Sequence, residues 1–451
     1  MMTLREAAEL AGGALHGADA RVERVVSDTR GLLAGDLFVA LRGERHDAHD
    51  FVAAAAAAGA VAALVERQLP LPLPQIVVAD SLAGLQRLAA GWRARHRLPV
   101  IGVTGSNGKT TTKQMLAALL AARGPVLATR GNLNTHIGVP LTLLGLRESQ
   151  ATAVIEMGAN HPGEIALLAA LARPDIALVT QAGDAHLEGF GSREGVARAK
   201  GELFQALDGR GVAVINADDV YAPLWRRFAG AAAVLQFGLG AAADVSARQL
   251  REEGESQRFE LVTPAGTAEV WLPLPGRHNV LNALGAAACG LALGLDPATL
   301  AEGFARLEPA QGRSAIRQTA AGDRLIDDSY NANPTSLRAG LELLARQPGR
   351  RIAVLGAMAE LGAQARELHV AAGSAARALG IEALHALGRH AADYVEGFGP
   401  RGQAHEQLES LLAALAAEPG PRSLLIKGSR SARMERVVAA LDGQIQPGDP
   451  H

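Results

Sequence analysis

The sequence has a single cysteine, Cys289, so no disulfide bond can form within the chain. It also lacks any run of about 18 uncharged apolar residues, the length that a membrane-spanning helix needs. The opening residues, MMTLREAAELAGG, are charged from their first turns and have no apolar core of signal-peptide length. We therefore expect a cytoplasmic protein without membrane insertion, in which Cys289 is a small buried side chain.

The sequence also has no large excess of positive or negative charge. The 44 Lys and Arg residues nearly balance the 46 Asp and Glu residues, for a net charge of -2. A basic excess drives binding to nucleic acid, so a nucleic-acid partner is not expected. Apolar residues are abundant, at 48% of 451 residues, which is enough to bury several cores. We expect several compact domains and, without a long exposed hydrophobic stripe, a monomer.

The order of apolar strands and helical runs divides the chain into three α/β domains. Residues 1–98 hold short strand candidates, such as DLFVAL and QIVVAD, beside Ala-rich helical runs. In residues 99–312, the strands VIGVTG, ATAVIEMG, DIALVTQAG and GVAVINADD alternate with amphipathic helices, as in a parallel sheet covered by helices. Residues 313–451 resume this alternation from DRLIDDSY onward. The pattern predicts a small N-terminal α/β domain, a central doubly wound P-loop ATPase-type parallel sheet and a Rossmann-like C-terminal domain.

The stretch VIGVTGSNGKTTTK, residues 100–113, predicts a phosphate-binding turn between a strand and a helix. Backbone N–H groups converge in such a turn, and the helix N-terminus adds positive potential. Lys109 can reach the β- and γ-phosphates of ATP, and the Thr110 hydroxyl can coordinate Mg²⁺. Val103 stands where the common P-loop has glycine, so the loop is a variant. The residues expected to hold the nucleotide are Thr104, Gly105, Ser106, Asn107, Gly108, Lys109, Thr110 and Thr111.

Three further side chains are candidates for metal chemistry. Glu156 ends a predicted strand, where its carboxylate can hold Mg²⁺ or cap the next helix. His186 follows another strand and is either structural or a metal ligand. Lys200 falls on the apolar face of a helical run. Its amine either extends along the helix to solvent or, when neutral and desolvated, reacts with CO₂ to form a carbamate ligand for a second Mg²⁺ beside His186.

Motifs along nearly the whole chain, from Ser27 to about Glu435, resemble those of the Mur ligases, the amide ligases of peptidoglycan synthesis. Each motif alone is modest, but together and in this order they are specific. They are TGSNGKTTTK, GNLNTHIGVPLTLL, EMGANHPGEI, AHLEGFGSREGVARAKGELF, GRHNVLNALGAAA, QGRS, DDSYNANPTSLRAGL, LGAMAELG and IKGSRSARME.

For the metals, the resemblance implies that Lys109 and Thr110 bind the triphosphate and a first Mg²⁺ together with Glu156. It further implies that His186 and a carbamylated Lys200 hold the second Mg²⁺. These roles agree with those inferred from the residues themselves.

For the nucleotide, the resemblance implies that Asn282 faces the adenine with His278 and Asn279 nearby, although all three can instead cap a helix. Arg313 would contact the γ-phosphate, which suits a guanidinium fork. Asp328 would bind the ribose hydroxyls from the third domain.

For the substrates, SDTR and LRGERHDAHDF resemble segments that hold a UDP-sugar, although both can be plain polar loops. Two asparagines after Asp328 would lie near the acceptor dipeptide, and Asn134 in the earlier motif GNLN is a further candidate for substrate binding. Thr135 stands where the family usually has a further asparagine. The residues expected to bind substrate are Ser27, Asp28, Thr29, Arg30, Gly43, His49, Asp50, Phe51, Asn134, Asn331 and Asn333.

The resemblance implies an ATP-dependent ligase that joins D-alanyl-D-alanine to UDP-N-acetylmuramoyl-tripeptide through an acyl phosphate. Closure of the third domain about a hinge near QGRS would complete the site. A ligase of the same group that adds the third peptide residue or a folate polyglutamate is an alternative, which DDSYNANP disfavours. A sugar-nucleotide sensor would need no second metal site, and a plain P-loop kinase is disfavoured by the variant loop.

Overall fold

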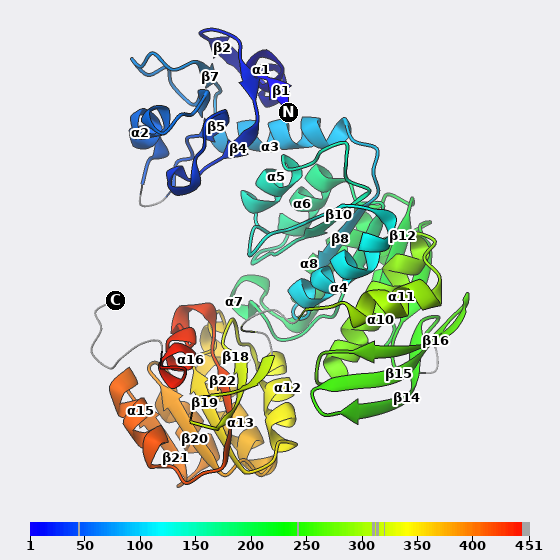
Figure 1. The fold of residues 1–451 in the computed structure, drawn as a ribbon, viewed down its shortest axis with the longest axis vertical. Coiled ribbons are helices and arrows are strands. Elements are labelled where there is room, and N and C mark those ends of the chain that lie inside the picture. The colour runs from blue at the N-terminus through cyan, green and yellow to red at the C-terminus, as the bar shows by residue number, and fades with distance from the viewer. Residues whose placement is uncertain (44–45, 241–242, 309–311, 313–314, 320, 444–451) are drawn as a thin grey trace.

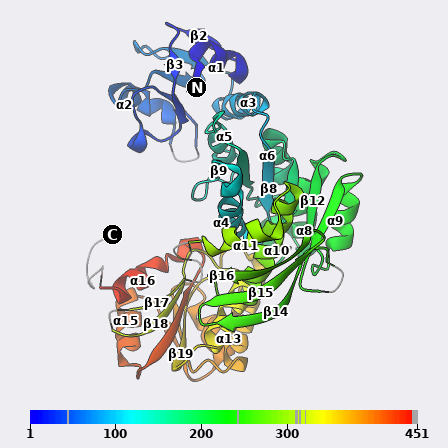
Figure 2. The same cartoon turned by 45° about the vertical axis from the view of Figure 1, so that its right-hand side comes forward.

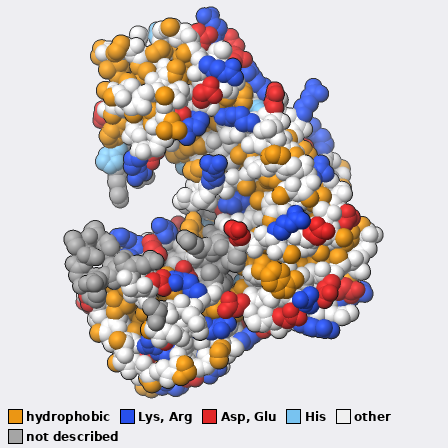
Figure 3. Space-filling view, viewed as in Figure 1, with side chains coloured by type: hydrophobic (Ala, Val, Ile, Leu, Met, Phe, Trp, Pro, Cys, Tyr) orange, Lys and Arg blue, Asp and Glu red, His pale blue; other side chains and the backbone are white. Residues whose placement is uncertain are grey.

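The computed structural model describes residues 1–43, 46–240, 243–308, 312, 315–319 and 321–443. The N-terminal and C-terminal domains stand at the two ends of a central domain and face the same side (Figure 1). Turning the molecule by 45° keeps the central domain between the other two (Figure 2). The space-filling view shows an open cleft between the upper and lower domains (Figure 3). In the described part of the chain, no helix has the length and apolar character to cross a membrane.

The N-terminal domain is built on a five-stranded sheet of order β2-β7-β6-β5-β4, in which β2 alone is antiparallel to its neighbour. A short antiparallel pair, β1 and β3, lies beside it. The strands are β1 (Met2–Thr3), β2 (Ala14–His16), β3 (Arg21–Val22), β4 (Arg24–Val26), β5 (Asp36–Val39), β6 (Ala62–Val65) and β7 (Gln75–Val77). Its helices are α1 (Leu4–Ala11), α2 (Val52–Ala57) and α3 (Ser81–Ala94).

Helix α3 fastens this domain to the central one. The Trp92 indole donates to the Leu146 carbonyl at 3.1 Å, and the Arg93 guanidinium donates to the Ala172 carbonyl at 2.9 Å. One apolar cluster continues from α1 and α3 into the central helices α5 (Gly138–Leu143) and α6 (Glu164–Ala172). Because separating the two domains here would expose buried apolar surface, α3 stabilises their contact.

The central sheet has six parallel strands in the order β13-β12-β11-β8-β10-β9. Strands such as IALV are apolar without interruption because helices bury both faces. The strands are β8 (Val100–Thr104), β9 (Val126–Ala128), β10 (Thr152–Glu156), β11 (Ile176–Val179), β12 (Val212–Asn216) and β13 (Ala233–Phe237). Helices α4 (Lys109–Leu120), α10 (Arg277–Ala292) and α11 (Pro297–Ala305) share a core with one face. Helices α6, α8 (Arg193–Gln205) and α9 (Ala222–Ala229) share a core with the other.

A three-stranded antiparallel sheet in the central domain is an addition that the sequence pattern did not predict. It consists of β14 (Ser246–Glu253), β15 (Ser256–Thr263) and β16 (Gly266–Leu272). Phe259 and Leu261 on β15 bury their side chains in the same core as α10, which also contains the buried Cys289. The sheet therefore extends one face of the central core.

The C-terminal sheet has the order β17-β18-β22-β19-β20-β21, parallel except for the edge strand β17. Its strands are β17 (Ala315–Gln318), β18 (Arg324–Asp328), β19 (Arg350–Gly356), β20 (Ala383–Leu387), β21 (Gly402–His405) and β22 (Arg422–Lys427). One face packs on α12 (Pro334–Ala345), α13 (Ala365–Ala378) and α14 (Ala391–Phe398), the other on α15 (Leu408–Ala417) and α16 (Glu435–Leu441). The predicted α/β class, with a doubly wound central sheet and a Rossmann-like C-terminal domain, is confirmed. The predicted hinge at QGRS falls mostly outside the described residues.

Candidate active site

The P-loop connects β8 to α4 and depends on its glycines. Gly105 has φ 144° and Gly108 has φ 80°, a region that other residues rarely adopt. A Cβ atom at either position would also collide with a neighbour, the Thr180 hydroxyl at Gly105 and the Asn282 amide at Gly108. The Thr180 hydroxyl donates to the Asn107 carbonyl at 2.5 Å. The loop is thus held against β11 and α10 with its N–H groups at the start of α4.

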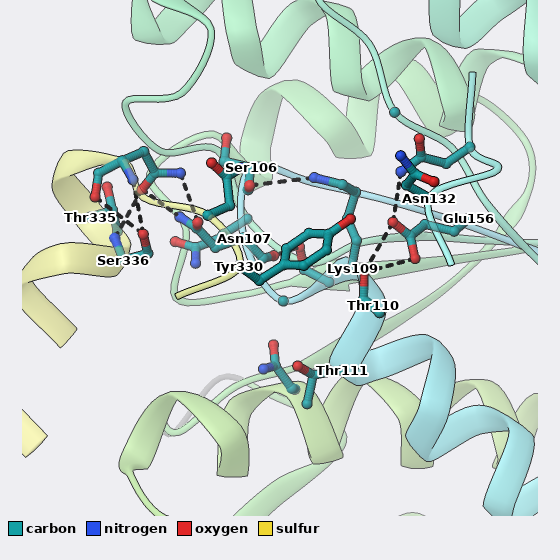
Figure 4. A pocket seen from close by; sticks show the side chains of 18 of the residues that line it. Ser106, Asn107, Lys109, Thr110, Thr111, Asn132, Glu156, Tyr330, Thr335 and Ser336 are labelled. Carbon is teal, nitrogen blue, oxygen red and sulfur yellow. Dashed lines mark hydrogen bonds between the residues drawn. The ribbon is translucent and has the colours of Figure 1, made fainter. Parts of the chain in front are cut away.

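A cavity of about 600 Å³ opens over this loop and is lined by two domains. Figure 4 shows the P-loop residues, Glu156 and residues of the C-terminal domain around it. The central domain contributes the P-loop, Glu156 and His186, and the C-terminal domain contributes Asp328, Tyr330, Asn331, Asn333, Lys427 and Arg430. An adenosine triphosphate would therefore contact both domains, a placement typical of nucleotide sites at the carboxyl ends of α/β sheets.

Lys109 and Thr110 begin α4 and point along the cavity. The Lys109 ammonium donates to the Gly105 carbonyl at 2.6 Å. The Thr110 hydroxyl donates to the two Glu156 carboxylate oxygens, at 2.9 and 3.1 Å. A hydroxyl and a carboxylate side by side are the oxygen ligands that Mg²⁺ takes in proteins.

Glu156 ends β10 and is almost fully buried. Burial acts to raise its pKa, but the ammonium groups of Lys113 and Lys109, with hydrogen bonds from Asn134 and Thr110, hold that pKa below its usual value. The Asn134 amide donates to one carboxylate oxygen at 2.8 Å, and the Lys113 nitrogen lies 3.2 Å from the other. The carboxylate is therefore ionised and fixed in orientation at neutral pH.

Lys200 lies behind the cavity wall and is 1% exposed. Its nitrogen donates to the Ala159 carbonyl at 3.2 Å and lies 5.3 Å from the centre of the Phe190 ring. Burial, followed by the charge of Lys109, lowers the pKa of Lys200 to about 7. A substantial fraction of this amine is neutral at physiological pH, the form that reacts with CO₂.

His186 lies at the end of the loop that follows β11, and its backbone has a positive φ of 54°. Its imidazole Nδ1 pairs with the carboxylate of Glu360, which comes from the C-terminal domain. This hydrogen bond is the main cause that holds the pKa of Glu360 below its usual value. The Glu188 N–H also donates to the Glu360 carbonyl at 3.2 Å, so the two domains are joined here by backbone as well as side chains.

A second link between the domains lies beside the P-loop. The Asn333 amide donates to the Asn107 side-chain oxygen at 2.8 Å. The Asn333 side chain also accepts the Ser336 N–H at 2.9 Å as the N-cap of α12. The C-terminal domain thus docks on the P-loop through the first turn of a helix.

The same cavity also carries groups suited to a nucleoside. Asp328 ends β18, and the Lys427 ammonium donates to its carboxylate at 2.5 Å and to the Asn331 carbonyl at 2.9 Å. The Asn282 amide donates to Asn279 at 3.2 Å on α10. Burial lowers the pKa of His278, so its ring is neutral at pH 7.

Comparison with known proteins places these features in a family. The model of the Mur ligase middle domain matches residues 103–290, that of the Mur ligase, glutamate ligase domain matches residues 312–449, and that of the Mur ligase family, catalytic domain matches residues 21–92. The chain belongs to the Mur ligase family. The UDP-N-acetylmuramoyl-tripeptide–D-alanyl-D-alanine ligase of Escherichia coli (strain K12) is 45% identical over 443 residues, 98% of each chain.

Solved structures resemble this Mur ligase over almost its full length. MurF from Acinetobacter baumannii matches with a TM-score of 0.92 and 37% identity, covering 97% of this chain and 98% of that one. The MurF ligase from Thermotoga maritima in complex with ADP matches with a TM-score of 0.81 and 30% identity, covering 93% and 97%.

Most residues predicted for the nucleotide and metals line the same cavity. They are Ser106, Asn107, Gly108, Lys109, Thr110, Thr111, Glu156, His186, Asn282 and Asp328, joined by the predicted substrate residues Asn134, Asn331 and Asn333. The Thr104 side chain does not line the cavity, because its hydroxyl is fully buried and donates to the Met157 carbonyl at 2.8 Å, and its role toward the nucleotide stays a prediction. Its side chain holds β8 in place instead. Arg313 lies outside the described residues.

The predicted UDP-sugar segments meet at one edge of the N-terminal sheet. Residues 27–30 follow β4, and Gly43 and residues 46–51 follow the parallel neighbour β5. Among the described residues, none from this domain lines the nucleotide cavity. Asp28 binds Arg30 at 2.6 Å, which holds the pKa of that carboxyl to about 2. Phe51 is 45% exposed.

His49 has partners within its own domain, and its predicted contact with substrate stays a prediction. Its ring is fully buried, with Nδ1 2.5 Å from Asp47 and Nε2 accepting the Glu66 N–H at 2.9 Å. Nδ1 therefore bonds within the loop and Nε2 ties the loop to the residue after β6, and a direct substrate contact of the ring nitrogens would require one of these bonds to break. Asp50 and Gly43 remain at the surface of the same loop.

Three charged residues at the site were not singled out from the sequence: Lys113, Glu360 and Lys427. Lys113 follows Lys109 by one helical turn, so the reasoning used for Lys200 would have found it on the buried side of α4. Glu360 and Lys427 lie in the quoted motifs LGAMAELG and IKGSRSARME, but their partners come from distant parts of the chain. Only the folded structure pairs them.

Proposed function

We propose that this Mur ligase uses ATP to join D-alanyl-D-alanine to the tripeptide carboxylate of UDP-N-acetylmuramoyl-tripeptide. The observation that carries the proposal is the P-loop cavity shared by the central and C-terminal domains, in a chain similar over almost its full length to ligases of that name. The product would be the UDP-linked pentapeptide, with ADP and phosphate. Because both the energy source and the UDP-linked tripeptide are nucleotides, we place the reaction in the cytoplasm.

The residues around the P-loop suit phosphoryl transfer. Backbone N–H groups at the start of α4 and the Lys109 ammonium would bind the β- and γ-phosphates. Asp328, at the end of β18, would accept the ribose hydroxyls, and Asn282 would face the adenine. Arg313 is proposed for the γ-phosphate from its sequence position alone.

The side chains also fit magnesium. Thr110 and Glu156 would hold a first ion, since their oxygens already lie within 3.1 Å of each other. Among the described residues, no three His, Cys, Asp or Glu side chains gather into a metal site. A second ion at His186 would therefore draw on another oxygen, which a carbamate on Lys200 would supply. Bound Mg²⁺ would neutralise charge on the transferring phosphoryl group.

The reaction would proceed in two displacements on the substrates. An oxygen of the tripeptide carboxylate attacks the γ-phosphorus, the bond to the β-phosphate oxygen breaks, and ADP leaves. The dipeptide amine then attacks the acyl carbon, and the tetrahedral intermediate expels phosphate as the amine loses its proton. Lys109 stabilises the phosphoryl charge, and the Asn107–Asn333 and His186–Glu360 contacts hold the two domains together around the reacting groups.

The UDP part would bind at the loop edge of the N-terminal domain, near Ser27 to Arg30 and Phe51. This edge belongs to the first of three proposed units, residues 1–98, 99–312 and 313–451. Figure 3 shows the cleft that the substrate would span from there to the nucleotide. We expect a monomer, because each of the proposed binding regions is provided by a single chain.

Phosphate release by the purified protein tests the function. The mixtures contain ATP and Mg²⁺ with the UDP-tripeptide, the dipeptide, both or neither. Rapid release that requires both substrates is the expected result, and Lys109→Met should abolish it. Release that ignores the dipeptide would refute the acceptor assignment, and nucleotide binding without any release would favour a sensor.

A further inference from the structure

Lysine is rare in this chain, and its four copies gather at one place. Of the 44 Lys and Arg residues, only Lys109, Lys113, Lys200 and Lys427 are lysines. Lys109 and Lys427 line the nucleotide cavity, while Lys113 and Lys200 contact the cavity residues Glu156 and Ala159. The proposed function leaves Lys113 without a role.

Lys113 is placed against the proposed ligand of the first metal. It is 5% exposed, and its nitrogen lies 3.2 Å from an Oε of Glu156, itself 2% exposed. The Thr110 hydroxyl and the Asn134 amide complete the contacts of that carboxylate. A buried ion pair therefore lies at the cavity, with Glu156 in its lining and Lys113 behind it.

Holding a charge at this position is costly. Lys109 and Lys113 are four residues apart on α4, and like charges at that spacing repel each other. Burial removes water from the ammonium, a further cost that its pairing with Glu156 only partly offsets. A cation kept here in spite of both costs would be expected to act on something else that enters the cavity.

The charges around Glu156 indicate which ligand Lys113 acts on. The charges that act most strongly on Glu156 are those of Lys113 and Lys109, so this immediate cluster carries one net positive charge; Glu164 also lines the cavity but is not among the main charges acting on Glu156. A free divalent cation would meet a site of its own sign, whereas a triphosphate brings enough negative charge to reverse that sign. A cation that arrives with the nucleotide would therefore be accepted at a position where a lone cation is not.

We propose that Lys113 makes the first metal site dependent on nucleotide, by neutralising Glu156 so that a divalent cation binds tightly only together with the triphosphate. Lys113 is thus a positioning residue whose charge sets the order of loading, with the metal and ATP entering as one complex. The inference rests on the proposed function, because it assumes that the P-loop binds ATP. It adds the order in which the metal ion and the nucleotide bind.

Manganese binding to the full-length protein tests this proposal without any turnover. Bound Mn²⁺ is measured by electron paramagnetic resonance with and without the β,γ-methylene analogue of ATP, and Glu156→Gln identifies the signal of the first site. The unaltered protein is expected to bind Mn²⁺ at that site at least about tenfold more tightly with the analogue than without it. Equal affinities would overturn the proposal, and this comparison needs no variant at Lys113.

Two substitutions then separate charge from shape. Lys113→Met, which keeps the length of the side chain, is expected to raise the Mn²⁺ affinity without nucleotide by about tenfold, since it removes one unit of opposing charge. Lys113→Arg keeps the charge and should leave that affinity low. If Lys113→Met instead weakens Mn²⁺ binding in both states, Lys113 only orients Glu156 and the proposal is wrong. Calorimetry with the analogue alone distinguishes failure of this proposal from failure of the proposed function. Absence of nucleotide binding would contradict the proposed function itself.

Discussion

Replacing Lys200 with methionine should abolish turnover and yet stabilise the fold. At about pH 7.5, an amine with the pKa of about 7 found for Lys200 is roughly three-quarters neutral, whereas one with the ordinary pKa of 10.5 is neutral in roughly one molecule in a thousand. Keeping it neutral costs roughly 4 kcal/mol, since that pH lies about 3 units below 10.5 and each unit is worth about 1.4 kcal/mol. A functional gain would offset this cost.

The dependence on pH follows from the same shift. Because the pKa of Lys200 is lowered on folding, the unfolded chain binds more protons between about pH 7 and 10.5, and this group makes the free energy of unfolding rise with pH across that window. Lys200→Met removes this contribution. In CO₂-depleted buffer at about pH 7.5, this variant should melt at a higher temperature than the unaltered protein. Its free energy of unfolding should be about 2 kcal/mol larger, because imperfect packing of the methionine removes about half of the gain.

The assay combines turnover with detection of the carbamate. Phosphate release in CO₂-depleted buffer should fall at least tenfold and recover with bicarbonate, while ¹³C-bicarbonate should give a carbamate signal by NMR. Lys200→Met should lose at least a hundredfold in turnover, show no carbamate signal and ignore bicarbonate. Near-normal turnover of Lys200→Met, or a lowered melting temperature with unchanged bicarbonate dependence, would refute the reasoning and leave Lys200 a structural residue.

Three more substitutions probe the C-terminal and N-terminal domains. Asp328→Asn should raise the KM for ATP about tenfold with little change in kcat, because a charged acceptor of the ribose hydroxyls is lost, and an unchanged KM would contradict that role. Asn333→Ala should lower stability by about 1 kcal/mol and also open the molecule in X-ray scattering, whereas Asp296→Ala, which removes the N-cap of α11 away from the interface, should change stability alone. Phe51→Ala should raise the KM for the UDP-substrate about tenfold if its exposed ring stacks on the base, and the exposed Trp271→Ala serves as the unaffected control.

The sequence predicted the parts of the fold that depend on local pattern. Uninterrupted apolar strands identified the parallel sheets, because both faces of each strand are buried, and the glycine-rich turn before Lys109 identified the P-loop. The burial of Lys200 followed from its position on an apolar helix face. The sheet formed by β14–β16 was missed, although β15 alternates buried and half-buried residues with the period of a strand.

Contacts between distant residues could not be predicted in this way. Glu360 reaches His186, and Asn333 reaches Asn107, only because the C-terminal domain docks on the central one. Nothing in the local sequence around His49 distinguishes a substrate contact from its two bonds within the domain. Such pairings depend on domain geometry, which local periodicity does not encode.

The measurement that tests the central claim most directly follows one oxygen atom. The UDP-tripeptide is prepared with ¹⁸O in its terminal carboxylate, and the phosphate released with ATP, Mg²⁺ and D-alanyl-D-alanine is analysed by mass spectrometry. An acyl phosphate requires that one carboxylate oxygen leave with the phosphate, so each phosphate should carry one ¹⁸O from fully labelled substrate while the pentapeptide forms. Unlabelled phosphate would contradict the account, because ATP would then be cleaved without activation of the tripeptide.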